Sequence, residues 1–279
     1  MKRELTIDGS GTPIEKEYRT IARAIQRCTP ADVTFDAKAY APRAVERVRA
    51  MWLRRMESEY RSTTVFSALV AQLFDANATI DHAGVVLRMA QDELRHAEIC
   101  GETVIALGGV AVGQAPPTVR PLAMHRGCSP EERAMRNVMY GTCLGEMVNC
   151  ARFVDAIDTM HDPYLRDVTR RLLADEVLHG QFGFHYLEAW RPWLDANPEV
   201  RVSLERYLRH AFAVLERDLS GAGAAPEALT DDERALGVPD RARLPETFYA
   251  TVTGAIVPGL ERFGIEAGAA WKARSLVLS

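Results

Sequence analysis

One five-residue motif occurs twice in the sequence and constrains the fold more than any other feature. The motif is Asp-Glu-x-x-His, at Asp92–His96 and again at Asp175–His179. In an α-helix, residues three positions apart lie on one face, about 4.5 Å apart along the axis. Each copy can therefore present a carboxylate and an imidazole to one point, and these two ligand types together suit iron, manganese or zinc.

The sequence around both motifs has the apolar spacing of α-helices. Four long helices are expected over residues 43–74, 80–107, 130–160 and 162–190, with turns at residues 75–79 and 161. Ser129 is the expected N-cap of the third helix, and Glu132 would complete a capping box. A fifth helix is expected over residues 197–221, a short one from residue 230, and a sixth over residues 245–263 with a bend near Pro258. No strand is expected, so the predicted fold class is all-α.

A carboxylate site inside a helix bundle also needs a Glu from each of two further helices at the depth of the motifs. Residues at equal depth on two antiparallel helices are equally far from the turn that joins them. Glu59 and Glu93 are centred on residue 76, and Glu146 and Glu176 are centred on residue 161, so both midpoints fall in expected turns. The predicted metal ligands are Glu59, Glu93, His96, Glu146, Glu176 and His179.

This ligand set resembles that of the ferritin-like di-iron carboxylate superfamily, of the non-haem oxygenase and oxidase type. The Asp-Glu-x-Arg-His form of the first motif is similar to that of bacterial di-iron monooxygenase hydroxylases and soluble acyl-carrier-protein desaturases. The resemblance covers about residues 43–190. It implies a ferritin-like four-helix bundle with a long crossover loop, residues 108–129, and additional C-terminal helices. It also implies that Glu93 and Glu176 bridge the metals. Leu172 stands where arylamine N-oxygenases of the superfamily usually carry a seventh ligand, a His.

Four buried carboxylates are costly without compensation, and two divalent cations would neutralise them. The expected cofactor is a pair of iron ions, Fe2+ or Fe3+, with manganese as the alternative. A His ligand needs an acceptor for its second ring nitrogen. Asp92 and Asp175 are expected to fill this role, each toward the His of the other motif, and Arg95 to balance the charge of one Asp.

A substrate or dioxygen pocket is expected from residues one or two helical turns from the ligands. Ordinary helix packing is the competing interpretation for all of them. The predicted pocket residues are Thr142, Asn149, Cys150, Phe66, Phe153 and Gly183. The six arginines between Arg43 and Arg61 are interpreted as a solvated or salt-bridged face, with a docking surface for an acidic carrier protein or a nucleic acid as the lesser alternative.

Three segments are expected: an N-terminal extension at residues 1–42, the metal-binding bundle at residues 43–190, and a C-terminal helical extension at residues 191–279. The expected function is a dioxygen-activating oxygenase or oxidase that acts on a small or carrier-bound organic substrate and takes electrons from an external donor. The alternatives are a ferroxidase or other iron-handling protein, and a tRNA-modifying di-iron hydroxylase.

Composition narrows the expected partners. The formal net charge is −4, without the basic excess typical of nucleic-acid binding, so no nucleic-acid partner is expected. No apolar run approaches the roughly 20 residues of a membrane span, so no membrane partner is expected. The five cysteines include no Cys-x-x-Cys pair, which argues against a disulfide framework and indicates a cytoplasmic location. A homodimer is left open.

Overall fold

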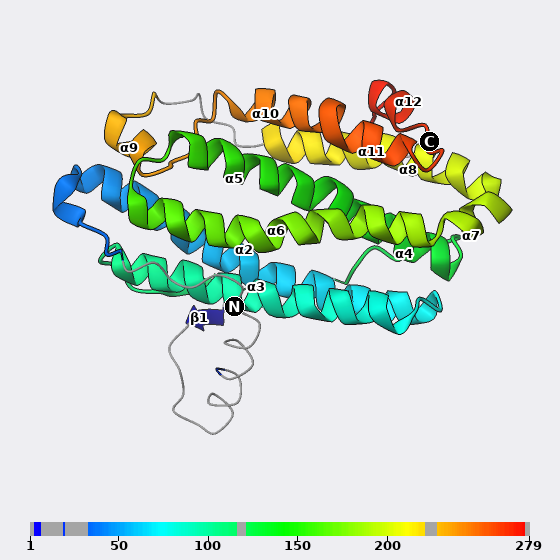
Figure 1. Cartoon of the computed structure of the whole chain (residues 1–279), viewed down its shortest axis with the longest axis horizontal. Coiled ribbons are helices and arrows are strands. Elements are labelled where there is room, and N and C mark those ends of the chain that lie inside the picture. The colour runs from blue at the N-terminus through cyan, green and yellow to red at the C-terminus, as the bar shows by residue number, and fades with distance from the viewer. Residues whose placement is uncertain (1–2, 7–18, 20–32, 116–120, 221–227, 277–279) are drawn as a thin grey trace.

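The computed structural model describes residues 3–6, 19, 33–115, 121–220 and 228–276 of the chain. These residues are mostly helical, which confirms the all-α expectation apart from one small sheet (Figure 1). Most of the predicted N-terminal extension, residues 1–42, lies outside the described residues. In the part of the chain that is described, no helix is long and apolar enough to cross a membrane.

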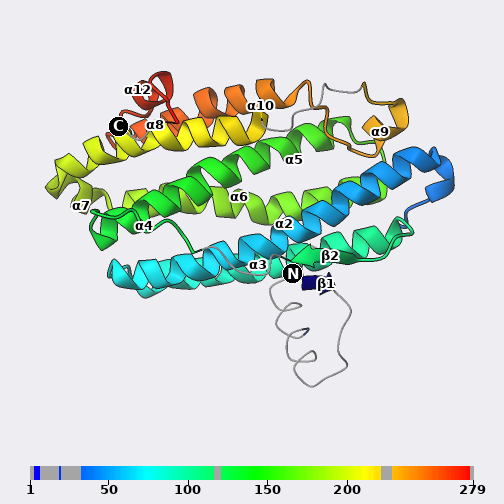
Figure 2. The same cartoon turned by 180° about the vertical axis from the view of Figure 1, so that it is seen from behind.

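Two helical pairs form the centre of the molecule. The first pair is α2 (Pro42–Asp75) and α3 (Ile80–Ala106), which pack against each other. The second pair is α6 (Pro163–Ala189) and a continuous helical segment made of α4 (Pro130–Val138), the π-helical η2 (Met139–Glu146) and α5 (Met147–Thr159). Because α2 contacts α4 and α3 contacts α6, the two pairs lie side by side (Figures 1 and 2).

Side-chain caps begin the helices of the second pair. The Ser129 hydroxyl accepts a hydrogen bond from the Glu132 N–H at 3.2 Å, as expected for an N-cap. The reciprocal half of the predicted capping box does not form, because the Glu132 carboxylate instead accepts from Arg136 at 2.6 Å. The Asp162 carboxylate caps α6 by accepting from the Leu165 N–H at 2.8 Å. These caps fix where both helices start, and so fix the depth of the residues that follow.

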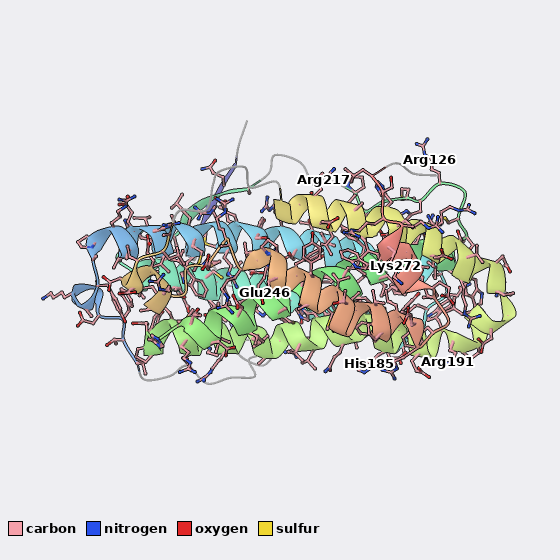
Figure 3. All side chains as sticks on the ribbon, turned by 90° about the horizontal axis from the view of Figure 1, so that it is seen from above. Arg126, His185, Arg191, Arg217, Glu246 and Lys272 are labelled. Carbon is pink, nitrogen blue, oxygen red and sulfur yellow. The ribbon has the colours of Figure 1, made fainter. Side chains whose placement is uncertain are left out.

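The C-terminal helices cover the α4–η2–α5 segment. They are α7 (Arg191–Ala196), α8 (Pro198–Ser220), α9 (Asp231–Ala235), α10 (Leu244–Thr251), the π-helical η3 (Val252–Ile256), α11 (Val257–Glu261) and α12 (Ala267–Lys272). A short 3-10 helix, η1 (Ala37–Ala39), precedes α2 and is not part of this layer. Here α8 contacts α4, and α10 contacts α5. Figure 3 views this layer from above, with the exposed Glu246 and Lys272 labelled. Instead of a simple bend, a π-helical stretch precedes Pro258, which has no N–H to donate to the preceding turn.

The expectation that the chain has no strand is wrong. β1 (Arg3–Thr6) pairs antiparallel with β2 (Val112–Ala115), with Leu5 opposite Gly113. Strands of four residues are too short to reveal an alternating pattern, which explains why periodicity missed them. The Gln114 N–H donates to the Glu57 carboxylate at 2.6 Å. This hydrogen bond fixes β2, and with it the start of the long connection after α3, against α2.

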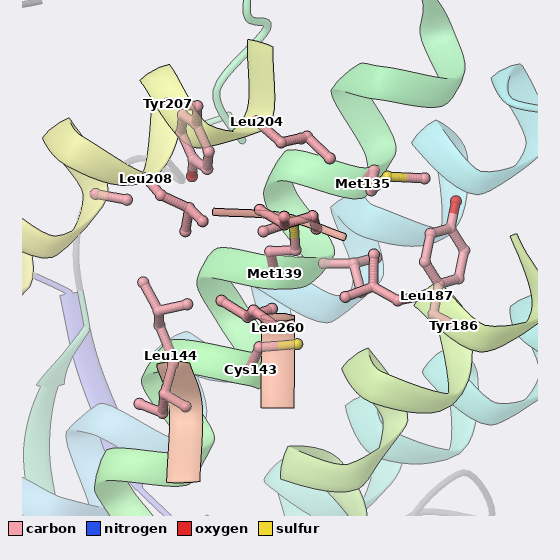
Figure 4. Close-up of a cluster of buried hydrophobic side chains, with 14 of the residues drawn as sticks. Met135, Met139, Cys143, Leu144, Tyr186, Leu187, Leu204, Tyr207, Leu208 and Leu260 are labelled. Atoms are coloured by element: carbon pink, nitrogen blue, oxygen red, sulfur yellow. The ribbon is translucent and has the colours of Figure 1, made fainter. Parts of the chain in front are cut away.

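Two apolar clusters form the core, and one polar level separates them. On α2 the first cluster reaches from Ala44 to Met56, and the second begins at Phe66. The same division occurs on α3 and α6, where both Asp-Glu-x-x-His motifs lie between the clusters. Figure 4 shows part of the second cluster, where Met139 and Leu260 meet side chains of α6 and α8. Apolar packing on both sides therefore excludes water from the level of the motifs.

We predict opposite stability effects for two helical glycines. A Cβ on Gly183 of α6 would collide with the Thr142 side chain and approach the Cys143 backbone nitrogen to 3.1 Å. A Cβ on Gly84 of α3 would meet nothing within 4 Å. Gly183→Ala should therefore lower the free energy of unfolding by about 1–3 kcal/mol, and Gly84→Ala should raise it by about 0.5–1 kcal/mol. Chemical denaturation of both variants measures the difference, and equal stability would contradict the close packing.

Candidate metal centre

Four helical segments contribute acidic and imidazole side chains to one buried cluster. Two groups of four residues each offer one ligand atom per residue, and within each group these atoms lie within 4.8 Å of one another. The first group is Glu59, Glu93, His96 and Glu176, and the second is Glu93, Glu146, Glu176 and His179. The structure therefore brings together all six residues that the sequence analysis singled out as ligands. Glu93 and Glu176 belong to both groups.

Both imidazoles turn the same nitrogen toward the cluster. His179 Nδ1 lies 3.2 Å from Glu93 Oε1 and 3.3 Å from Glu176 Oε2. His96 Nδ1 lies 3.5 Å from Glu176 Oε1. The two rings are 5.9 Å apart between centroids. A ligand shared by the cluster would thus meet Nδ1 of each His.

The opposite ring nitrogens face the Asp residues of the motifs, each across to the other motif. His96 Nε2 lies 3.4 Å from Asp175 Oδ2, and His179 Nε2 lies 3.5 Å from Asp92 Oδ2. A proton on Nε2, shared with a carboxylate, leaves the Nδ1 lone pair available to a metal. This is the cross-motif arrangement expected from the sequence.

Two arginines complete these contacts. Arg95 pairs with Asp175, as the sequence analysis proposed for this residue, and Arg88 pairs with Asp92 at 2.8 Å. Arg88 was not singled out, although its position four residues before Asp92 on the same helix is a recognisable pairing signal. The outer charges therefore cancel, two aspartates against two arginines, and the four inner Glu side chains remain to be neutralised.

Burial and mutual repulsion shift the acidity of the inner carboxyl groups. Burial and the charge of Glu176 raise the pKa of Glu59, Glu93 and Glu146. Glu176 behaves in the opposite way: burial favours its neutral form, but the contact with His179 and the charge of His96 outweigh burial and lower its pKa to about 2. For His179, burial opposes protonation, but Asp92, Glu176 and Glu93 raise its pKa well above the usual value. Positive charge placed in the cluster, from a proton or a cation, would therefore stabilise it.

Several buried polar atoms at the centre of the cluster lack a hydrogen-bond partner among the described residues. They are both carboxylate oxygens of Glu93, both of Glu176, and Nδ1 of His96 and of His179. Leaving a buried polar atom unsatisfied costs about 1–3 kcal/mol, and more when it is charged. All six atoms belong to the two candidate ligand groups. Carboxylate and imidazole donors without other partners fit a pair of divalent transition-metal ions.

The π-helical η2 ends at Glu146 and was not foreseen. Such segments are rare and occur frequently at functional sites. Glu146 still lies at the expected depth because the chain between Glu146 and the turn at residue 161 is regular α-helix. Thr142 lies within η2, where α-helical spacing does not apply.

The predicted pocket residues have different environments, and the structure does not bring them together around one space. Thr142 is fully buried and donates to the Val138 carbonyl at 2.7 Å. Gly183 packs directly on Thr142, so it provides close helix approach and no room for a substrate. The Phe66 ring lies 5.7 Å from the His179 ring, as packing against the cluster. Half-buried Cys150 stands near the cluster, where burial and the charges of Glu176 and Glu146 raise its pKa to about 12.

A cavity of about 440 Å³ is lined by residues that lie one helical turn from Glu59 and from Glu146. Asn149, one turn after Glu146, is the only predicted pocket residue that lines it. Arg55 also lines it, one turn before Glu59, and its guanidinium lies over the Phe153 ring at 4.2 Å from the centroid. Arg55 is half-buried and packs on an aromatic ring, which the expected solvated or salt-bridged face of arginines on this helix did not include. Its spacing of four residues from Glu59 was the available signal.

Cys100 was also missed. It lies four residues after His96 on α3 and is fully buried. Burial and the negative charge of Glu59 raise the pKa of its thiol well above the usual range, which keeps it neutral beside the cluster.

Comparison with models of protein families and with curated proteins finds no match to this chain.

We predict that removal of either shared carboxylate releases metal. Glu93→Gln and Glu176→Gln keep side-chain size but remove a charge that belongs to both ligand groups. Metal analysis should find about two ions per chain in the unaltered protein and most of that content lost in both variants. Glu102→Gln, at an exposed position of the same helix as Glu93, is the control and should keep the full content. Full occupancy in both shared-carboxylate variants would disprove the ligand assignment.

We further predict that the two aspartates act through the imidazoles. Asp92→Asn and Asp175→Asn should weaken metal binding by roughly 10- to 100-fold, because the His ring loses the acceptor that fixes its tautomer. Competition with a chelator measures the affinity, and circular dichroism checks that the fold is kept. Asp81→Asn, exposed on the same helix as Asp92, should bind metal normally. Unchanged affinity in both variants would show that the His–Asp contacts are incidental.

Proposed function

We propose that this protein is a dioxygen-activating di-iron oxidoreductase, an oxygenase or oxidase of the ferritin-like carboxylate superfamily. The observation that carries the proposal is that Glu93 and Glu176 belong to both candidate ligand groups. Two groups joined in this way are suited to a pair of metal ions with bridging carboxylates. The six donors, four carboxylates and two imidazoles, also suit manganese, which is the alternative metal.

The arrangement of the helices supports the proposed ferritin-like bundle. Each helical pair supplies one lone Glu and one Glu-x-x-His motif: Glu59 with the motif on α3, and Glu146 with the motif on α6. The long connection between α3 and α4 joins the two pairs. This is the distribution of ligands and loops expected for a carboxylate bundle with a crossover.

The protein residues have three tasks in this proposal. Bound iron would supply the redox chemistry that activates dioxygen. Asp92 and Asp175 hold the Nε2 protons of the ligand imidazoles, and Arg88 and Arg95 hold these two aspartates in place. The apolar clusters on both sides exclude bulk water, which limits side reactions of a strong oxidant. Electrons come from an external donor, and the site of action is taken to be the cytoplasm.

The cavity beside Glu59 and Glu146 favours oxidation of an organic molecule over iron storage. Its volume of about 440 Å³ lies in the range of small-molecule sites. Apolar and charged residues both line it, including Trp52, Met160 and Arg55.

The test is to add ferrous iron to the protein under anaerobic conditions and then to admit dioxygen. We expect oxidation to stop at about two ferric ions per chain, because the described residues offer ligands for one metal pair. Dioxygen uptake and ferric absorbance measure this, and Glu176→Gln should oxidise iron no faster than buffer alone. Continued oxidation of many ferrous ions per chain into a soluble mineral would establish iron handling instead and defeat the proposal.

A further inference from the structure

The cavity lies next to the candidate metal centre along two helical segments. Along α2, Met51, Trp52 and Arg55 line it, and Glu59 follows one turn later. Along the third helical segment, Glu146 is followed one turn later by Asn149, which lines it. One helical turn is about 5.4 Å. A molecule held at Arg55 and Asn149 is therefore within one or two turns of the carboxylates that face the metals.

Two guanidinium groups in this cavity form no ion pair within the described residues, although the charge of Arg55 acts to lower the pKa of Glu59 one turn away. Arg55 and Arg152 both line it, and neither forms an ion pair with any residue that the structure describes. Burial and the positive charge of Arg55 lower the pKa of Arg152, so the two like charges are close enough to repel. The rings of Phe153 and Trp52 lie under Arg55, at 4.2 and 5.5 Å from their centroids, which fixes one of the two groups.

The remaining charged side chains of the cavity wall are already satisfied. Their contacts are Arg243 with Asp155 at 2.7 Å, Arg234 with Asp231 at 2.6 Å, Asp218 with Arg217 at 2.8 Å, and Asp240 with the Ala242 N–H at 2.9 Å. Local pairing thus leaves the guanidiniums of Arg55 and Arg152 without an ion pair, and with the charge of Asp240 the described cavity wall carries a net charge of +1. An anion placed between two guanidiniums gains charge-assisted hydrogen bonds, the strongest kind available on a side chain.

We propose that the cavity binds the anionic head group of an amphiphilic organic molecule, a carboxylate or a phosphate, between Arg55 and Arg152. The proposal rests on the proposed function, because it makes this molecule the substrate class of the di-iron centre. The apolar part of the molecule packs on Met51, Trp52 and Met160, and on Leu229 and Val238. A head group fixed by two arginines sets which carbon atoms of the substrate come nearest to the metals.

The experiment measures binding, without turnover, of four eight-carbon probes to the metal-loaded protein by calorimetry. The probes are octanoate, octyl phosphate, octanamide and octylamine. We expect octanoate or octyl phosphate to bind at least tenfold more tightly than octanamide, and octylamine to bind least. A preference between the two anions distinguishes a carboxylate from a phosphate head group. Equal binding of octanoate and octanamide would overturn the proposal.

Arg152→Gln is the decisive variant, because Arg152 belongs to neither apolar cluster and is not adjacent to a candidate ligand in sequence. Losing one charge-assisted contact should weaken binding of the preferred anion on the order of 10- to 100-fold and leave octanamide binding unchanged. Arg152→Lys should recover part of the loss, since it restores the charge without the planar fork. Arg54→Gln, next to Arg55 but exposed and outside the cavity wall, should bind all probes normally.

These variants also separate anion binding in the cavity from direct coordination of the anion by metal. If octanoate affinity stays unchanged in Arg152→Gln, the anion binds elsewhere and the proposal is wrong. Metal content, measured on the same samples, tests the function independently. Anion selectivity that depends on Arg152 in a protein without iron would support the cavity while refuting the di-iron centre, and the reverse result would do the opposite.

Discussion

The structure depends on the compensation of four carboxylates gathered inside a helical protein. An uncompensated buried ion costs several kcal/mol, and the whole stability of a domain is about 5–15 kcal/mol. Four such groups would therefore be enough to prevent folding if nothing offset them. Partial protonation, indicated by the raised pKa of Glu59, Glu93 and Glu146, is one form of compensation, and bound cations are the other. The paired Asp92 and Asp175 show that the protein neutralises its outer acids with its own arginines and leaves the inner acids without such partners.

The rest of the fold holds these acids at one level. Apolar clusters lie on both sides of them along α2, α3 and α6, so a shift of any helix along its axis would move charged side chains into apolar surroundings. The third helical segment carries Glu146 next to a π-helical stretch, and α8 and α10 pack on its outer side. The C-terminal helices thereby support the segment whose backbone is least regular. The same covering layer supplies Leu229 and Val238 to the wall of the cavity.

The sequence predicted the cluster better than its surroundings, for a physical reason. Equal depth on two helices follows from counting residues away from a turn, and it holds wherever the helix between turn and ligand is regular. That condition is met for Glu59, Glu93, Glu146 and Glu176. It fails at Thr142, which lies inside η2. Contacts made across the tertiary structure were beyond such counting. The position of Arg55 over Phe153 and the pairing of β1 with β2 depend on segments far apart in the chain.

The packing differs between the two sides of the candidate ligands along the helices. On the side of the second apolar cluster, Gly183 lies against Thr142 and Cys143 so closely that not even a methyl group fits. On the other side, beyond Glu59 and Glu146, the packing opens into the cavity lined by Arg55 and Asn149. The cavity therefore lies in the half of the protein that contains the start of α2 and the end of α5. In this half the helices end and loops provide the wall, so the reacting partner can change with loop sequence while the ligand level stays fixed.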